Sequence, residues 1–266
     1  MQIIDTWQRS ASRLIAVAAG REAAELVVQN CRLVNVNSRE ILDGWEVAVV
    51  KGRFAYVGPS ANHCVGANTT VYDALGKFII PGLCDGHMHI ESGMLTPAEF
   101  AAAVIPHGTT TMFTDPHEIA NVLGLSGVKM RHDEAMMQPI NIFTQMPSCA
   151  PSAPGLETTG FEIGAEEVAE AMKWPGIIGL GEMMNYPGVI NGDPKMLSEM
   201  AETMDANKTV GGHYASPDRG IPFHAYVAGG PSASDSKFQW QPDGEAFHIM
   251  IGSLEDASDD EEEEED

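Results

Sequence analysis

Two histidines, two positions apart, carry the clearest chemical signal in the sequence. His87 and His89 lie in the segment Asp85-Gly-His-Met-His-Ile-Glu91, which follows an apolar run and a Pro-Gly pair. On an extended strand, residues i and i+2 point to the same side, so both imidazoles can reach one metal ion. An isolated pair of this kind is often a surface feature, but its place at a predicted strand end favours a metal site.

Two further candidates also follow apolar, glycine-containing strands. Glu182 lies in Gly179-Leu-Gly-Glu-Met-Met-Asn185, and His213 follows Gly211-Gly212. A buried carboxylate needs a partner, and a bridging position between two cations would supply one. Taken alone, a salt-bridged glutamate and a structural histidine are the simpler interpretations. Taken together, the candidates predict four metal ligands: His87, His89, Glu182 and His213.

A second polar cluster, Asp115-Pro-His117-Glu118, follows the β-branched run that ends at Thr114. These side chains suit substrate contacts or support of metal ligands. The alternative is a helix N-terminus with Asp115 as the cap, Pro116 at the first position and Glu118 at the third. Both interpretations can hold together. We predict catalytic roles for Asp115, His117 and Glu118, in addition to Glu182.

The elements that must position these residues alternate between strands and helices. Strands are predicted at 82–85, 109–114, 140–145, 176–181 and 209–213, and helices at 119–137 and 165–173 and after 96 and 193. Alternation implies a parallel sheet, because parallel strands need crossover connections. Polar residues at several strand ends favour a (β/α)8 barrel over an open doubly wound sheet.

Capping residues mark two of these helices. Thr96 is a predicted cap with Pro97 in the first turn, and Asp193-Pro194 begins another helix. In the second helix, the expected apolar face consists of Leu197, Met200, Ala201 and Met204.

The domain organisation follows from changes in this pattern. We expect an N-terminal helix in 1–24, a small antiparallel β domain at 25–78, and the barrel at 79–230. Residues 231–254 form an irregular segment in this prediction. Residues 255–266 include ten acidic side chains, and we expect a disordered tail because like charges repel.

The composition of the chain argues against some classes of binding partner. The formal net charge of −23 over 266 residues argues against nucleic acid or an anionic membrane surface. The four cysteines form no CxxC motif, which indicates reduced thiols in a cytoplasmic protein. We expect neither a signal peptide nor a membrane span, because no apolar stretch reaches about 18 residues.

Read together, the motifs resemble those of the amidohydrolase superfamily and, within it, the adenine deaminases. The resemblance covers roughly residues 10–230. It rests on the segments 80–91, 108–118, 179–185, 212–215 and 224–230, and the β-rich segment 52–58 resembles part of the family's small β-sandwich domain.

This resemblance implies an α/β fold with a (β/α)8-type metal-dependent hydrolase barrel and a small N-terminal β-sandwich-like domain. His87 and His89 would bind one ion, Glu182 would bridge a pair, and His213 would hold the second. The implied metals are manganese or iron, and imidazole and carboxylate ligands are also compatible with zinc. The implied reaction is hydrolysis of a C–N bond in a cyclic amidine. It converts adenine to hypoxanthine and ammonia in purine catabolism, in an enzyme that could be a homo-oligomer.

The sequence also departs from the family pattern. The family's Ser-Asp-His-Glu motif is replaced after Gly230 by Pro-Ser-Ala-Ser-Asp-Ser-Lys237, and no segment supplies its metal-binding aspartate. Residues 79–253 are fewer than the roughly 200 that a barrel needs. We therefore expect a C-terminally incomplete barrel of five or six strands. Another amidohydrolase acting on a cyclic amide or N-acyl substrate, and a truncated inactive homologue, remain the alternatives.

Overall fold

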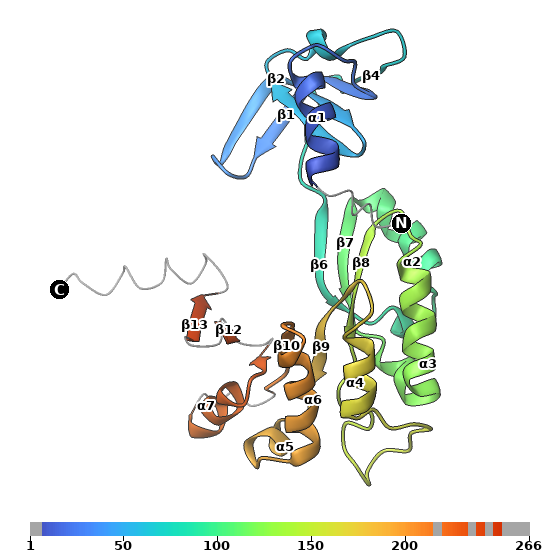
Figure 1. The fold of residues 1–266 in the computed structure, drawn as a ribbon, viewed down its shortest axis with the longest axis vertical. Helices are drawn as coiled ribbons and strands as arrows, with labels where there is room; N and C mark the ends of the chain where they lie inside the picture. The colour runs from blue at the N-terminus through green and yellow to red at the C-terminus, as the bar shows by residue number, and fades with distance from the viewer. Residues whose placement is uncertain (1–6, 215–219, 234–237, 243–246, 252–266) are drawn as a thin grey trace, which may run out of the picture. The chain divides into compact units, whose positions relative to one another are not determined.

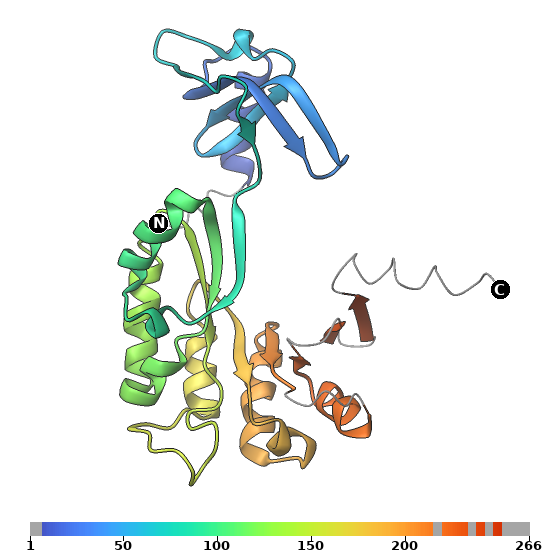
Figure 2. The ribbon, with the colours of Figure 1, turned by 180° about the vertical axis from the view of Figure 1, so that it is seen from behind.

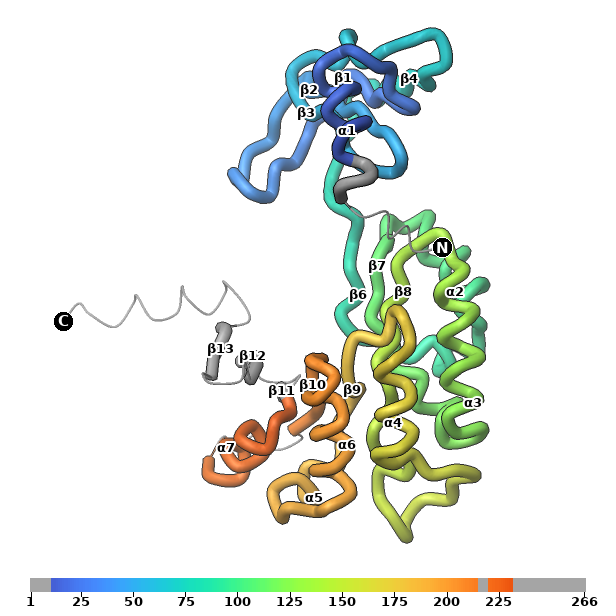
Figure 3. The backbone as a smooth tube through the Cα atoms, in the orientation of Figure 1, coloured from blue at the N-terminus to red at the C-terminus, as the bar shows by residue number. Residues whose placement is uncertain are grey.

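The computed structural model describes residues 7–214, 220–233, 238–242 and 247–251 (Figure 1), and Figure 3 traces the backbone as a tube. The chain divides into two compact units, and the boundary in the sequence lies between Gly82 and Leu83. The helix expected before residue 25 belongs to the first unit, together with the β-strands that follow it.

The first unit consists of one five-stranded sheet and helix α1 (Trp7–Ala18). The strands are β1 (Leu26–Asn35), β2 (Glu40–Val50), β3 (Arg53–Gly58), β4 (Thr70–Asp73) and β5 (Phe78–Ile79), and a short 3-10 helix, η1, spans Asn62–Cys64. The prediction of an antiparallel unit is correct for β1–β2 and β2–β3 but wrong for β4 and β5. Both pair parallel with β1, because residues 59–69 carry the chain across instead of turning it back.

The core of this unit lies between α1 and the sheet. Val17 of α1 and Val27, Ala48 and Val50 of the strands are buried in one apolar cluster. A sandwich requires a second sheet packed on the first, and the described part of this unit contains a single sheet with a helix against it.

The second unit is built on a six-stranded parallel sheet whose spatial order, β11-β10-β9-β8-β7-β6, follows the order in the chain (Figure 1). Its strands are β6 (Leu83–Met88), β7 (Thr109–Thr114), β8 (Asn141–Met146), β9 (Ile177–Met183), β10 (Thr209–Gly212) and β11 (Ser232–Ala233). This order is that of a (β/α) barrel, and among the described residues β6 and β11 each pair on one side only. Because all strands are parallel, their carboxyl ends share one edge.

Helices connect successive strands and run alongside the sheet (Figure 2). They are η2 (Ile90–Gly93), α2 (Pro97–Val104), η3 (Ile105–His107), α3 (His117–Ala135), α4 (Ala165–Ala171), α5 (Tyr186–Ile190), α6 (Pro194–Asp205) and α7 (Ile221–Ala228). The predicted caps are confirmed, since Thr96 accepts the Glu99 N–H and Asp193 accepts the Lys195 N–H. Asp115 is not a cap, because Pro116 holds that position without a side-chain bond.

The predicted apolar face of α6 is partly wrong. The buried residues are Met196, Glu199, Met200 and Thr203, at positions i, i+3, i+4 and i+7. Leu197 is 41% exposed and Ala201 also faces solvent. The buried face is therefore shifted by about one residue from the predicted face. The apolar pattern could not identify it, because one of its members is a glutamate.

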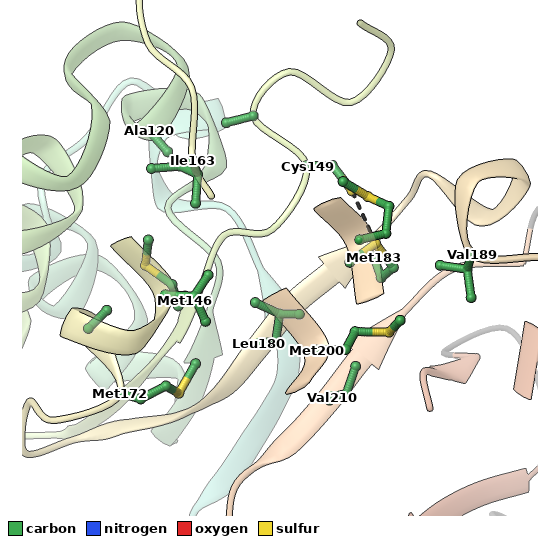
Figure 4. Close-up of a cluster of buried hydrophobic side chains, with 14 of the residues drawn as sticks. Ala120, Met146, Cys149, Ile163, Met172, Leu180, Met183, Val189, Met200 and Val210 are labelled. Atoms are coloured by element: carbon green, nitrogen blue, oxygen red, sulfur yellow. Dashed lines mark hydrogen bonds between the residues drawn. The ribbon is translucent and has the colours of Figure 1, made fainter. Parts of the chain in front are cut away.

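A methionine-rich core lies between the sheet and its helices (Figure 4). Leu180 and Met183 of β9 pack in it with Met146 of β8 and Met200 of α6. The Cys149 thiol contacts the Met183 sulfur at 3.4 Å. This packing fixes β9, the strand that carries Glu182.

The chain after α7 differs from the irregular segment expected at 231–254. It contains β11 and an antiparallel pair, β12 (Phe238–Pro242) and β13 (Phe247–Ile251). The predicted acidic tail at 255–266 lies outside the described residues. Among the described helices, none is both long and apolar enough to cross a bilayer.

Candidate metal centre

The carboxyl ends of β6, β9 and β10 bring the four predicted ligands together. His87 lies in β6 and His89 directly after it, Glu182 lies in β9, and His213 follows β10. The Nε2 atoms of His87 and His89 are 3.2 Å apart, as expected for alternate residues of one strand. His87 and Glu182 are 95 residues apart in the chain and meet because the strands that carry them are parallel.

Glu182 is the centre of this group. Its Oε1 atom contacts His87 Nε2, and lies 2.9 Å from His89 Nε2 and 3.0 Å from His213 Nε2. The Glu182 side chain is only 10% exposed, whereas the His87 side chain is 34% exposed. The imidazoles therefore stand between a buried carboxylate and solvent, and we call His87, His89, Glu182 and His213 the imidazole cluster.

The imidazoles and the carboxylate shift one another's pKa values. Burial raises the pKa of Glu182, but hydrogen bonds from His213, His87 and His89 outweigh burial, so this pKa lies well below its ordinary value. Hydrogen bonding to Glu182 raises the pKa of His87, and raises that of His89 to about 9, although burial opposes both shifts. Without metal, protons hold the imidazoles against the carboxylate, and a cation would replace them.

Asp115 lies behind Glu182, on the side away from solvent. Asp115 is fully buried, and its Oδ2 accepts the backbone N–H of Glu182 at 2.9 Å. A Cβ added at Gly181 would come within 2.0 Å of that same oxygen, so only glycine allows the approach. Asp115 thus fixes the backbone of β9 beside the candidate ligand.

His117 is buried beside Asp115. Its Nε2 is 2.9 Å from the Cys149 carbonyl oxygen, and its Nδ1 is 3.7 Å from Asp115 Oδ1. Burial lowers the pKa of His117, but the Asp115 carboxylate, the Cys149 carbonyl and the Glu182 carboxylate together raise it by more. Neither Asp115 Oδ1 nor His117 Nδ1 has a hydrogen-bond partner among the described residues.

Glu118 contacts the imidazole cluster from its outer side. Its Oε2 is 3.2 Å from His89 Nδ1, and its Oε1 accepts a hydrogen bond from Ser92 at 2.6 Å. A carboxylate on the second nitrogen of a ligating histidine fixes the orientation of the ring. Of the three residues predicted from this motif, Glu118 is therefore placed to orient His89, and Asp115 to position Glu182.

Sequence reasoning missed two hydroxyl groups that support β9. Ser148 donates to the Glu182 carbonyl at 2.7 Å, and Tyr226 donates to the Met183 carbonyl at 2.6 Å. Both side chains are buried. Ser148 follows a predicted strand, which is a signal that could have marked it, but Tyr226 reaches β9 from helix α7 and has no local signal.

The donor set fits a divalent cation. Ligand atoms from His87, Glu182 and His213 lie within 4.8 Å of one another, and so do those from Asp115, His117 and Glu182. Imidazole nitrogen and carboxylate oxygen together bind zinc, iron and manganese. The cluster also brings three imidazole nitrogens close to one carboxylate oxygen, so a cation bound there would have to displace their protons.

Comparison with known proteins shows the family to which the chain belongs. Residues 78–224 match the model of the Amidohydrolase family, which is more than half of the chain. Adenine deaminase from Ruegeria pomeroyi is 71% identical over 227 residues, covering 85% of this chain and 38% of that protein. Adenine deaminase from Clostridium botulinum is 46% identical over 224 residues, covering 84% of this chain and 37% of that protein. The chain spans less than two-fifths of these relatives.

Solved structures share the fold at low identity. A variant of atrazine chlorohydrolase TrzN from Arthrobacter aurescens TC1, complexed with zinc and atraton, is 16% identical with a TM-score of 0.57. The match covers 77% of this chain and 58% of the TrzN chain. A triazine hydrolase variant is 15% identical with a TM-score of 0.52 and the same coverage.

Proposed function

Because the chain belongs to the amidohydrolase family, we propose that it binds divalent metal ions and performs the hydrolytic deamination of adenine to hypoxanthine and ammonia. The observation that carries this proposal is the convergence of three imidazoles from two strand ends on the Glu182 carboxylate. The identity to adenine deaminases, over 85% of this chain, supports adenine as the substrate.

In this proposal, His87 and His89 would hold one ion, His213 would hold a second, and Glu182 would contribute to both. When bound, such ions lower the pKa of a water and stabilise charge that develops on the substrate. Manganese or iron is the proposed metal, and the donor set also accommodates zinc. Because the three imidazoles keep Glu182 ionised, this carboxylate is suited to binding cations rather than to donating a proton.

Residues around the ligands have supporting roles in the same proposal. Asp115 holds the backbone N–H of Glu182, and Glu118 holds the outer nitrogen of His89. Both contacts fix ligand orientation before a cation binds, which reduces the ordering needed on binding. The half-exposed His87 side is the open side, from which a planar purine could approach.

The test is an assay of the purified 266-residue chain with adenine and added Mn²⁺, in which hypoxanthine and ammonia are both measured. We expect equal amounts of the two products, and loss of at least about 100-fold in rate for Glu182→Gln, which removes the ligand charge. Glu166→Gln changes an exposed glutamate on α4 and should behave like the unchanged chain.

The outcomes separate the alternatives. Equal ammonia release by the unchanged chain and Glu182→Gln would remove Glu182 from the mechanism. Hydrolysis of a cyclic amide or N-acyl compound without any reaction of adenine would assign another amidohydrolase activity. Metal binding without turnover of either substrate class would identify an inactive homologue.

A further inference from the structure

We propose that the Tyr226 hydroxyl sets the position of His213 relative to Glu182, which makes Tyr226 a positioning residue for the ion that His213 would hold. Tyr226 belongs to helix α7 and is fully buried. Its hydroxyl donates to the Met183 carbonyl oxygen at 2.6 Å. The inference rests on the metal binding in the proposed function but not on adenine as the substrate.

Strands β9 and β10 are out of register where they reach the imidazole cluster. Between the pairings made by Leu180 and Met183 with β10, β9 contains two residues, and Glu182 is one of them. Opposite both, β10 contains only Gly211. An extra residue in one strand is a bulge, which redirects side chains and disrupts the regular ladder of hydrogen bonds. The ladder alone therefore does not fix the distance from Glu182 to the end of β10.

The backbone of Glu182 itself is held without Tyr226. Asp115 accepts the Glu182 N–H at 2.9 Å, and Ser148 donates to the Glu182 carbonyl at 2.7 Å. Asp115 follows β7 and Ser148 follows β8, so these contacts fix Glu182 on the side of the sheet away from β10. The position of His213, which follows β10, depends on other contacts.

The Met183 carbonyl joins β9 to His213. It accepts the His213 N–H at 3.3 Å, which is long for a hydrogen bond of this kind. The same carbonyl accepts the Tyr226 hydroxyl at 2.6 Å. The short bond holds the carbonyl in the direction that the long bond needs. Because Met183 is the residue after Glu182, this carbonyl links the backbones of the two candidate ligands.

Tyr226 also contacts the chain on both sides of His213. A Cβ added at Gly212 would collide with the Tyr226 hydroxyl, so only glycine allows this approach. The Tyr226 ring centroid lies 5.8 Å from that of Tyr214. The residues before and after His213 therefore both pack against one buried side chain.

The decisive variant is Tyr226→Phe, because it removes the hydroxyl and keeps the ring against Tyr214. Tyr186→Phe is the matched control. The Tyr186 ring centroid lies 6.5 Å from that of Tyr226, and in the described part of the chain the hydroxyl bonded to Met183 is that of Tyr226. Both variants thus lose one hydroxyl from the same aromatic group.

The first measurement is hydrogen exchange at single amides of the metal-free chain. We expect the His213 amide to exchange about 5–10-fold faster in Tyr226→Phe than in the unchanged chain, because its acceptor is no longer held. The Glu182 amide should keep its rate, since Asp115 still accepts it. A purely structural role would accelerate both amides alike. Tyr186→Phe should change neither.

The second measurement is calorimetry of Mn²⁺ binding to the full 266-residue chain. We expect two binding steps for the unchanged chain and for Tyr186→Phe. His213→Gln identifies one step by abolishing it. Tyr226→Phe should weaken that same step about 10–100-fold and leave the other unchanged.

Equal exchange of the His213 amide in Tyr226→Phe and Tyr186→Phe would overturn the inference, and so would equal weakening of both Mn²⁺ steps. If Tyr226→Phe does not fold, Gly212→Ala provides the second test, because its Cβ displaces the hydroxyl while Tyr226 is kept. The same selective loss is expected, and unchanged Mn²⁺ binding would overturn the inference. A chain that binds no Mn²⁺ would contradict the proposed function, whereas exchange of the His213 amide would still decide whether Tyr226 positions this residue.

Discussion

Glu199 of α6 is a carboxyl group that the structure buries completely without a partner. It is 0% exposed, and neither of its oxygens has a hydrogen-bond partner among the described residues. Burial raises the pKa of Glu199 to about 8 from an ordinary value of 4.5. The folded chain therefore keeps this proton up to about pH 8, whereas the unfolded chain releases it above about pH 4.5.

The sign of the effect on stability follows from proton counts. Between pH 4.5 and pH 8 the folded state binds more protons at Glu199 than the unfolded state does, so the free energy of unfolding falls as pH rises. Each pH unit corresponds to about 1.4 kcal/mol, so the full window corresponds to at most about 5 kcal/mol. Below pH 4.5 Glu199 is protonated in both the folded and the unfolded state, so this loss of stability is absent.

Glu199→Gln removes the titrating group and keeps the shape. We expect the variant to match the unchanged chain near pH 4.5 and to exceed it in free energy of unfolding by about 3 kcal/mol at pH 7. Urea unfolding of the metal-free proteins across this range measures the difference. The histidines titrate in both proteins, so the difference isolates Glu199.

Glu202→Gln, on the same helix and less buried, is the control and should show no such trend. A stability difference between Glu199→Gln and the unchanged chain that stays constant from pH 4.5 to pH 8 would refute the reasoning, since it would mean that Glu199 titrates alike in both states. Glu199→Met should stabilise the chain at every pH in the range, because it also removes the unsatisfied polar atoms.

Three further predictions concern the supports of the site. Gly181→Ala places a Cβ 2.0 Å from the Asp115 carboxylate, and it should lower the free energy of unfolding by about 1–3 kcal/mol in a denaturant titration and weaken metal binding. Glu118→Ala should weaken Mn²⁺ affinity about 10–100-fold in calorimetry, and unchanged affinity would contradict its role in orienting His89. Arg131→Met leaves the Glu91 carboxylate, which is 9% exposed, without its ion pair at 3.5 Å. It should cost about 3–5 kcal/mol of stability by thermal unfolding, part of which returns if the glutamate is also neutralised.

Local sequence signals predicted much of the second unit. Strand β7 begins and ends where the β-branched run does, and the caps at Thr96 and Asp193 mark the starts of α2 and α6. The convergence of His87 and His89 follows from strand geometry alone. These features depend on neighbours within a few residues, so the sequence contains the information directly.

Features set by distant contacts could not be predicted in this way. Asp115 fits the local pattern of a helix cap, yet its side chain bonds to a backbone group 67 residues later. Glu199 fits an exposed helix position, yet tertiary packing places it at the centre of the buried face. In the first unit, β4 and β5 pair parallel with β1 because of a crossover, and alternation within each strand does not reveal strand direction.

The imidazole cluster also connects strands that are not neighbours in the sheet. β6 hydrogen-bonds only to β7 among the described strands, and most of its residues are exposed. His87 of β6 and His89, which follows it, nevertheless contact Glu182 of β9, across the carboxyl ends of β7 and β8. A sheet that curls around its own axis shortens this path, as in a barrel. The side chains of the imidazole cluster therefore also hold the edge strand toward the centre of the sheet, so the curvature of the sheet and the geometry of this cluster depend on each other.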